Sequence, residues 1–517
     1  MSYTAHYVGS GGNDANSGLT WALRKLTLNG AEDTPLTAAR HTVYVAPGTY
    51  RELLTCDLSG PTAYATGTVS VTKGSKTVTG LSTLWAANAE ANDWFQCPVL
   101  ASGTDGVTDG SSTFVSANGN FQAGHVGLTI RISTKAAAII ATVVDSDTIT
   151  LADTAGTAVT PSAASGLTYN VGPSSPHKVA SVDSDTQITL VDAWDDPTLT
   201  TLAYQVWGHI EYIGDYLGTN TDGVGGVVRI TGSADDIALT RANCITATSI
   251  NKRTFSGFLM DGTSSNIIST ATACSNWAIY QCYIQSYSTS SIIVFSGTGV
   301  NNTVMSCFIT GEFRQVQFTH STTVDNAGGL TQNCILFSSY GSCVDSVRIG
   351  GISVKNCLML GSTGAKITTA LTVGQATTVN NCLIHTVGVG FQATAVGEIL
   401  EDYNNIIGCN TARTNTTIGA HSKVNLTVLE TRWFFNAIYA NAAGKLITPF
   451  DLASDSGLLN VAGLNPPILD MRRQTLQDAQ REWGALEYDS TLKAMGGFIK
   501  TASGLPLTNI KTINGLA

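Results

Sequence analysis

The stretch Asn356-Cys357-Leu358-Met359 is one copy of a four-residue phrase that recurs through the middle of the chain. In each copy a small or polar residue precedes Cys, Gly or Asn, and two apolar residues follow. The other copies are Ser256-Gly257-Phe258-Leu259, Gln281-Cys282-Tyr283-Ile284, Ser306-Cys307-Phe308-Ile309, Asn333-Cys334-Ile335-Leu336, Asn381-Cys382-Leu383-Ile384 and Asn404-Asn405-Ile406-Ile407. Their second residues lie 23 to 27 positions apart. Such a period is typical of a solenoid, in which each repeat buries its apolar face against its neighbours.

Two solenoids have repeats of about this length, the leucine-rich repeat and the right-handed parallel β-helix. A leucine-rich repeat requires a ladder of Leu and often a helical return segment. Here the return segments, such as residues 286–295, are rich in Ser, Thr, Ile and Val and have no 3.6-residue periodicity. We therefore predict an all-β fold, a right-handed parallel β-helix.

The repeated cysteine has a packing explanation. Equivalent residues of successive rungs stack at the strand spacing of about 4.8 Å. A free thiol behaves as a compact hydrophobe and suits an inward-facing stack, and the Asn before it can continue a ladder of side-chain amides. We predict one interior column of these cysteines along the axis of the coil.

The composition narrows the possible functions. Of the 517 residues only 12% are charged, against about 25% in typical proteins. The net charge of −10, without a Lys/Arg cluster, argues against a nucleic-acid partner. No stretch is apolar for long enough to cross a membrane, and the first residues lack the basic start and apolar core of a signal peptide. We expect synthesis in a reducing cytoplasm.

The eleven cysteines form an odd number, and none belongs to a Cys-x-x-Cys pair. Six of them, Cys409 included, lie on or beside the repeated phrase. We therefore expect reduced core thiols, no metal and no cofactor.

Near the N-terminus the chain carries a Gly-Asn-Asp loop at 12–14, Trp21 at the start of a short predicted helix that runs through Leu28, and Val43-Tyr-Val-Ala-Pro-Gly-Thr-Tyr50. This combination resembles the first rung of the pectate-lyase-like right-handed β-helix superfamily. The resemblance implies a helix that plugs the open end of the coil, which would otherwise expose unpaired strand edges. Residues 1–60 are accordingly assigned to the capping helix and the first rungs.

Residues 64–207 interrupt the coil. The segment Val-Asp-Ser-Asp-Thr occurs at 144–148 and again at 182–186, and each copy leads into a strand-like run. We infer two related small β-modules, the second nested within the first. The amino-acid sequence of residues 66–80, followed by Asp93-Trp94-Phe95, resembles modules of bacteriophage tail and fibre proteins.

The coil is expected to resume at 209 and to run to 447. Residues 448–488 resemble the segment that closes many β-helix chains. The C-terminal tail, 489–517, forms no obvious unit, and docking on a neighbouring subunit and disorder both remain open for it.

Hydrolysis of a polysaccharide requires two carboxyl groups about 5–5.5 Å or about 6.5–9.5 Å apart. Asp261 and Glu312 follow their phrases by similar offsets, two rungs apart, and are the candidate catalytic pair. The alternative is that both are turn residues that face water. Arg348 and Lys366 have the chemistry of a lyase base, but no acidic calcium cluster accompanies them.

Four tryptophans of the insert allow two interpretations, stacking on sugars or filling the cores of the small modules. They are Trp85, Trp94, Trp194 and Trp207.

The combined reading is a bacteriophage virion structural protein, namely a tail spike, fibre or head-decoration component. The resemblance implies a homotrimer that contacts phage tail or capsid proteins and a host-surface polysaccharide. The alternative is a polysaccharide lyase or glycoside hydrolase on the same scaffold. We do not favour catalysis, because such sites need carboxylates in defined positions and the coil is poor in them. A bacterial surface adhesin is a third reading, which the lack of an export signal disfavours.

Overall fold

A computed structural model describes residues 3–426 with short gaps, together with 434–435 and 451–452. The gaps are 34–35, 37–38, 98–99, 133–134, 136–137, 153–155, 173–175, 195, 287, 325–327, 339, 350, 362–364, 371–376, 381, 387, 395–397, 403, 408 and 417–421. The predicted segments 448–488 and 489–517, and the end of the coil near 447, lie almost entirely outside the described residues.

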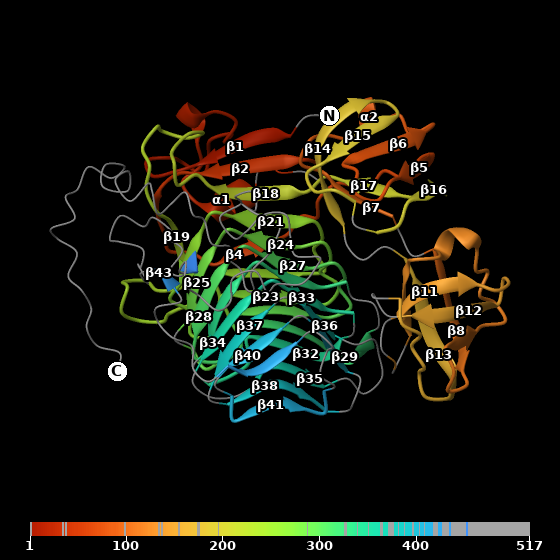
Figure 1. The fold of residues 1–517 in the computed structure, drawn as a ribbon. Helices are drawn as coiled ribbons and strands as arrows, with labels where there is room; N and C mark the ends of the chain where they lie inside the picture. Colours follow the sequence, from red (N-terminus) through yellow and green to blue (C-terminus); the bar gives the residue numbers. More distant parts are fainter. Residues whose placement is uncertain are drawn as a thin grey trace.

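Three parallel sheets wind around one apolar core (Figure 1), so the chain is a right-handed parallel β-helix, as the repeat predicts. Each rung contributes one strand to each sheet, and each strand pairs in parallel with its equivalents in the rungs before and after it. This topology excludes the leucine-rich repeat.

Sheet A contains β1 (Thr4–Val8), β2 (His41–Val45), β18 (Ile210–Gly214), β21 (Arg253–Ser256), β24 (Ala278–Tyr280), β27 (Thr303–Met305), β30 (Leu330–Gln332), β33 (Ser353–Lys355), β36 (Thr377–Asn380) and β39 (Ile399–Asp402). Sheet B contains β3 (Gly48–Tyr50), β19 (Val228–Thr231), β22 (Leu259–Asp261), β25 (Tyr283–Ser286), β28 (Phe308–Gly311), β31 (Ile335–Ser338), β34 (Leu358–Gly361), β37 (Leu383–Thr386), β40 (Asn405–Ile407) and β42 (Lys423–Leu426). Sheet C contains β4 (Leu54–Cys56), β20 (Ile245–Thr248), β23 (Ile268–Ala271), β26 (Ile293–Ser296), β29 (Val316–Val324), β32 (Val344–Ile349), β35 (Ala365–Ala370), β38 (Val389–Ala393) and β41 (Thr411–Thr414).

The cysteines of the phrase form the predicted interior column at the corner between sheets A and B. Their side chains are 0% exposed, and the sheet B residue that follows each of them is in register with its equivalents. Burial raises the pKa of the Cys307 thiol well above its ordinary value. The column consists of Cys282, Cys307, Cys334, Cys357 and Cys382.

The ends of the column correct the sequence alignment by one residue. The pairing of Leu259 with Tyr283 places Phe258, rather than Gly257, at the level of Cys282. At the other end the pairing of Leu383 with Asn405 places Asn404 at the cysteine level. The buried Asn404 accepts a hydrogen bond from the backbone N–H of Cys382 at 2.9 Å. The repeat is therefore defined by the inward-facing position at the corner and not by the residue type. The Phe258 ring and the hydrogen-bonded Asn404 amide occupy this position as the cysteines do.

The N-terminal cap differs in position from the prediction. Residues 21–28 contain only the 3-10 turn η1 (Trp21–Leu23), and the helix α1 (Leu28–Asp33) begins where the prediction ended it. Thr27 sets this start, because its hydroxyl accepts the backbone N–H of Gly30 at 2.8 Å.

A buried ion pair ties the cap to the coil. Glu32 of α1 accepts hydrogen bonds from Arg253 of β21 and from the Tyr212 hydroxyl of β18, the latter at 2.6 Å. Arg253 and Glu32 are 0% and 3% exposed. Because an unpaired charge at such a site costs several kcal/mol, this pairing fixes α1 on the coil.

The insert consists of a sheet and a barrel around one further apolar cluster, and it leaves the coil between β4 and β18 (Figure 1). The barrel is inserted between β7 and β14 of the sheet, and the short helices α2 (Trp85–Asn88) and η2 (Ala123–His125) accompany them. The sheet contains β5 (Thr68–Val71), β6 (Thr77–Leu81), β7 (Trp94–Gln96), β14 (His177–Ser184), β15 (Gln187–Leu190), β16 (Leu199–Leu202) and β17 (Gln205–Trp207). The barrel contains β8 (Ala101–Thr108), β9 (Thr113–Val115), β10 (Thr129–Ile132), β11 (Ala138–Val143), β12 (Thr148–Ala152) and β13 (Ala164–Val171).

Beyond the coil, β43 (Phe434–Phe435) and β44 (Asp451–Leu452) pair in an antiparallel manner.

Candidate functional site

The insert contacts the coil on the outer face of sheet A, where a group of buried charged side chains lies. Asp93, which precedes β7, is 0% exposed and accepts both Nε and Nη2 of Arg40, at 2.8 Å and 2.5 Å. The Tyr3 hydroxyl donates to the same carboxylate at 3.0 Å and lies 3.1 Å from Nδ1 of His209. The pair Arg40–Asp93 therefore joins the coil to the insert without water between them.

Glu211 of β18 continues this network. Its carboxylate accepts the Tyr280 hydroxyl at 2.5 Å and lies 4.0 Å from Nζ of Lys178, which comes from the insert. His209 Nε2 lies 3.6 Å from the other carboxylate oxygen. Burial alone would raise the pKa of Glu211, but His209, Lys178 and Tyr280 stabilise the anion and lower the pKa to about 2. Glu211 is thus a permanent anion that holds the joint together.

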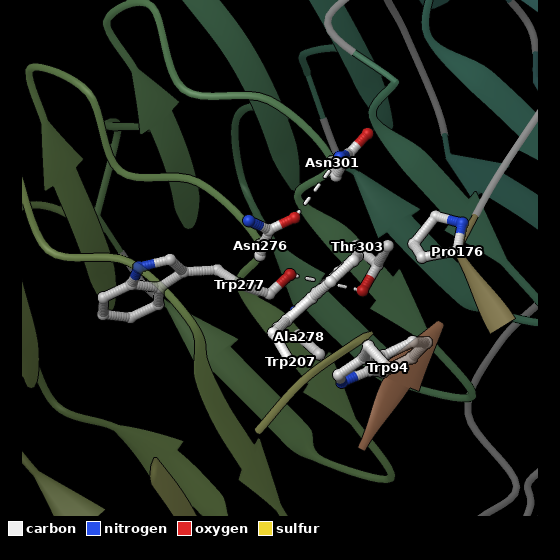
Figure 2. Close-up of a pocket in the computed structure, with 8 residues that line it drawn as sticks. All are labelled: Trp94, Pro176, Trp207, Asn276, Trp277, Ala278, Asn301 and Thr303. Carbon is white, nitrogen blue, oxygen red and sulfur yellow. Dashed lines mark hydrogen bonds between the residues drawn. The ribbon is translucent and has the colours of Figure 1, made fainter. Parts of the chain in front are cut away.

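Beside this network lies a shallow, half-open hollow between the insert and the coil (Figure 2). One wall belongs to the insert and consists of Trp94, Pro176 and Trp207. The opposite wall belongs to the coil, where the Asn301 amide donates to Asn276 at 3.3 Å. The remaining lining residues are Trp277, Ala278 and Thr303.

The chemistry of the hollow combines aromatic surface with planar amides. Trp94 is half-buried, whereas Trp207 is 2% exposed and its Nε1–H finds no acceptor among the described residues. Figure 2 shows that the Trp277 indole points away from the hollow, and this indole donates to the Ile250 carbonyl at 2.7 Å. A ligand with an apolar face and hydroxyl edges would match these walls.

The other two tryptophans of the insert do not reach this surface. Trp85 and Trp194 are 0% and 1% exposed, and both belong to the apolar cluster of the insert. Trp85 and Trp194 therefore fill the core of the insert, whereas Trp94 and Trp207 line the hollow.

Asp261, the first candidate catalytic residue, lies on the outer face of sheet B within a chain of ion pairs. Arg229 Nε donates to Asp261 at 2.9 Å, and its Nη2 lies 2.9 Å from the same oxygen. Nη1 of Arg229 donates to Asp236 at 2.5 Å, and Asp236 also pairs with Arg51. Both oxygens of the Asp261 carboxylate thus accept charge-assisted hydrogen bonds from Arg229, within a chain of ion pairs that extends to Arg51.

Glu312 lies two rungs from Asp261, beyond the strand position that is level with Asp261. Asp261 is level with Thr310 in sheet B, two rungs away, and Glu312 follows after the end of β28. Two rungs correspond to roughly 9–10 Å along the axis, and two residues add roughly 6–7 Å along the strand. These offsets place the two backbone positions roughly 11–12 Å apart, against the about 5–9.5 Å between carboxyl groups that hydrolysis requires, and the pair stays a prediction for mutagenesis. Glu312 is half-buried and has no ion-pair partner in the described part of the chain.

Three other acidic residues of the coil accept several hydrogen bonds each, as structural carboxylates do. Asp345 accepts from Gln317 at 3.0 Å and pairs with Arg314 at 2.8 Å. Glu398 accepts the Thr394 hydroxyl at 2.6 Å, and Glu401 pairs with Arg413. The side chains of Arg348 and Lys366 lie outside the described residues.

No group of three or more His, Cys, Asp or Glu side chains in the described ranges is placed to hold a metal ion. No described helix is long and apolar enough to span a membrane.

Sequence reasoning missed Arg229, Arg40 and Glu211, because their partners are distant along the chain. The coil wall of the hollow could have been found from the sequence. Asn276 and Asn301 are 25 residues apart and therefore occupy equivalent positions in successive repeats. Nothing in the sequence indicated that Trp94 would face them.

No family model matches the sequence, and no curated protein matches it. Seventeen solved chains are similar to it. A complex of XylC with xylose has 10% identity and a TM-score of 0.32, and the alignment covers 93% of this chain and 98% of that one. The gp54 tailspike of Acinetobacter baumannii bacteriophage AP22, solved with capsular saccharide, has 9% identity, a TM-score of 0.20 and coverage of 74% of both chains. The gp49 tailspike of Pseudomonas phage LKA1 has 12% identity, a TM-score of 0.22 and coverage of 75% and 72%.

These identities and TM-scores are too low for any of the likenesses to bear on activity, substrate or partner. The parallel β-helix that the repeat predicts is confirmed by the sheet topology of the chain itself.

Proposed function

We propose that this protein is a structural component of a bacteriophage particle, a tail spike, fibre or head-decoration protein, and that it attaches the particle to a host-surface saccharide. The observation that carries the proposal is the joint between insert and coil. Buried ion pairs hold the insert against a rod of stacked rungs, and the hollow lies in this joint. The amino-acid sequence of the insert, which resembles phage tail modules, supports the same function. Association into a homotrimer, with tail or capsid proteins as further partners, belongs to the proposal.

The hollow supplies what recognition of a sugar requires. A pyranose ring has an apolar face, which packs on an indole such as Trp94, and hydroxyl groups, which suit amides. Asn276 and Asn301 offer donors and acceptors from the coil.

The test is binding of the full chain to purified capsule or lipopolysaccharide of candidate hosts. Trp94→Ala should weaken binding at least tenfold, as measured by calorimetry. Trp21→Ala is the matched control, because Trp21 is also half-buried but contacts Arg24 and Tyr7 at the cap. Equal binding by wild type and Trp94→Ala would contradict the role of the hollow.

The same incubations test the enzyme alternative. The readout is the appearance of new reducing ends or of unsaturated uronate absorbance. If either appears and is lost in Asp261→Asn or Glu312→Gln, the protein is a depolymerase and the attachment role is wrong. Portal, capsid or tail genes beside this gene would support the virion role, and a carbohydrate-utilisation cluster would contradict it.

A further inference from the structure

The N-terminal end of the coil, where β1, β3 and β4 begin its three sheets (Figure 1), exposes large apolar side chains. Four of them gather at one corner of this end, and we call them the end patch. They are Leu26, Leu53, Ile237 and Leu239, which are 45%, 36%, 87% and 41% exposed. Among the described residues from 253 to 426, large apolar side chains with comparable exposure occur at Phe337 and Tyr340. A group of exposed apolar side chains from separate segments is typical of an interaction surface.

Polar side chains hold the segments of the end patch together. Arg51 donates through Nη1 to the Ser233 carbonyl oxygen at 3.2 Å and to Asp236 at 3.0 Å. These bonds tie the loop 232–241 to the residues that precede β4. Asn29 of α1 donates through Nδ2 to the Leu53 carbonyl oxygen at 2.7 Å, so the start of α1 lies against the same residues. The end patch is therefore one surface of three joined segments.

The loop that carries Ile237 is fixed by hydrogen bonds although its tip is exposed. Asp235 accepts the backbone N–H groups of Ile237 at 3.0 Å and Ala238 at 2.8 Å. Asp236 has a left-handed backbone, with φ of 68°, and its carboxylate pairs with Arg51. A side chain that is held in place before binding loses little conformational entropy on binding. Ile237 is thus suited to be an anchor that enters a pocket of a partner.

The charges beside the end patch decide between the possible partners. Asp33, Asp57 and Asp235 are exposed, whereas Arg51 is already paired with Asp236. The rim of the patch is therefore acidic. A two-fold contact between copies of this chain would bring the same acidic rim against itself, and anionic lipid or nucleic acid would be repelled. A protein with an apolar pocket and a basic rim is complementary to both features.

We propose that the end patch docks a partner protein that offers an apolar pocket to Ile237 and surrounds this pocket with Lys or Arg side chains. The end patch shares no residue with the hollow between insert and coil. Docking at the end patch and saccharide binding at the hollow are therefore separate properties, and failure of one leaves the other intact.

The probes are the proteins encoded by the genes on either side of the gene for this chain, each purified and measured against the full chain by biolayer interferometry. One of them should bind, and Ile237→Asp should weaken this binding at least tenfold. Ile237→Ser, which removes apolar surface without adding a charge, should weaken it in the same direction. Leu81→Asp is the matched control and should bind as the wild type does, because Leu81 is 69% exposed but lies on β6 of the insert.

The rim is tested with Asp57→Lys, which should slow association severalfold at low salt because it reverses one of the attracting charges. Unfolding temperatures of all variants should equal that of the wild type, since each substituted side chain is exposed.

Binding that Ile237→Asp leaves unchanged would overturn the proposal, and so would the lack of binding by every one of these proteins. Sedimentation of the chain alone and its mixing with anionic phospholipid vesicles test the other occupants. Self-association or vesicle binding that Ile237→Asp abolishes would also overturn the proposal.

Discussion

At the scale of single residues, two of the buried charges in the described part of the chain meet a counter-charge from a distant element. Arg253 with Glu32, and Arg40 with Asp93, join segments far apart in sequence. Histidines behave differently, because His6 and His41 meet as neighbours on β1 and β2, with Nε2 of His6 2.9 Å from Nδ1 of His41. Burial, followed by the charges of His41 and Lys25, lowers the pKa of His6 to about 4.

This shift predicts a loss of stability in acid. The unfolded chain binds a proton at His6 near the ordinary value of 6.5, and the folded chain does so only near 4. Stability that is fully present above pH 6.5 therefore falls as the pH drops toward 4, by at most about 3 kcal/mol from this group. Unfolding midpoints of wild type and His6→Gln, measured between pH 7 and pH 4, should diverge in slope, with the variant flatter. Parallel slopes would contradict the assignment.

At the scale of the structural element, the rung depends on a left-handed residue at the corner between sheets A and B. Gln281, Ser306, Asn333 and Asn356 have φ values of 52° to 54° just before the cysteine. Asn tolerates this conformation better than most residues, and β-branched residues tolerate it least. The Asn356 amide also donates to Asn333 at 2.9 Å, so the backbone requirement and the amide ladder favour the same residue.

Substitutions at Asn356 separate these two contributions. Asn356→Gly keeps the left-handed backbone and loses the amide bond, at a cost of about 1 kcal/mol. Asn356→Val loses the bond and also forces a β-branched residue into this conformation, which adds about 1–3 kcal/mol. Thermal unfolding should therefore rank wild type above Asn356→Gly and Asn356→Gly above Asn356→Val. A valine variant as stable as the glycine variant would show that the conformation is not limiting.

At the scale of the whole molecule, the coil and the insert form one unit because charge pairs cross their boundary. The Arg40–Asp93 pair and the Lys178–Glu211 contact both do so, and Asn301 of the coil donates to Gln96 of β7 at 3.1 Å. A module connected to the coil only by the two chain segments that enter and leave it would move relative to the coil. The joint instead holds the two walls of the hollow in a fixed relation.

Asp93→Asn should uncouple the insert from the coil. Removing one partner of a buried pair costs about 3–5 kcal/mol, because Arg40 would stay buried without its counter-charge. Hydrogen exchange should increase in β7 and β17 and stay unchanged in β28 and β31. Asp183→Asn is the matched control in the same module, since this exposed carboxylate contacts only Ser181, Gln187 and Thr189 among the described residues. Equal exchange in both variants would argue against the joint.

The repeated phrase was sufficient to predict the β-helix and its cysteine column. Apolar residues at a constant spacing have to face the same core, whatever the rest of the chain does. The alignment of the repeats was wrong by one residue at Phe258 and Asn404. The repeated motif gives only residue types, whereas the strand register shows which residue points inward.

The candidate site could not be predicted in this way. Asp261 and Glu312 looked equivalent by their offsets, but pairing with Arg229 and the early end of β28 distinguish them.

The sequence by itself determined the coil, since its contacts are local and every rung repeats them. Only the tertiary structure decided where the insert lies, which charges meet and which tryptophan faces the amides of the coil. Those contacts join residues as far apart as Tyr3 and His209. No periodicity records them, because each is made once, by a fold that had first to bring both partners together.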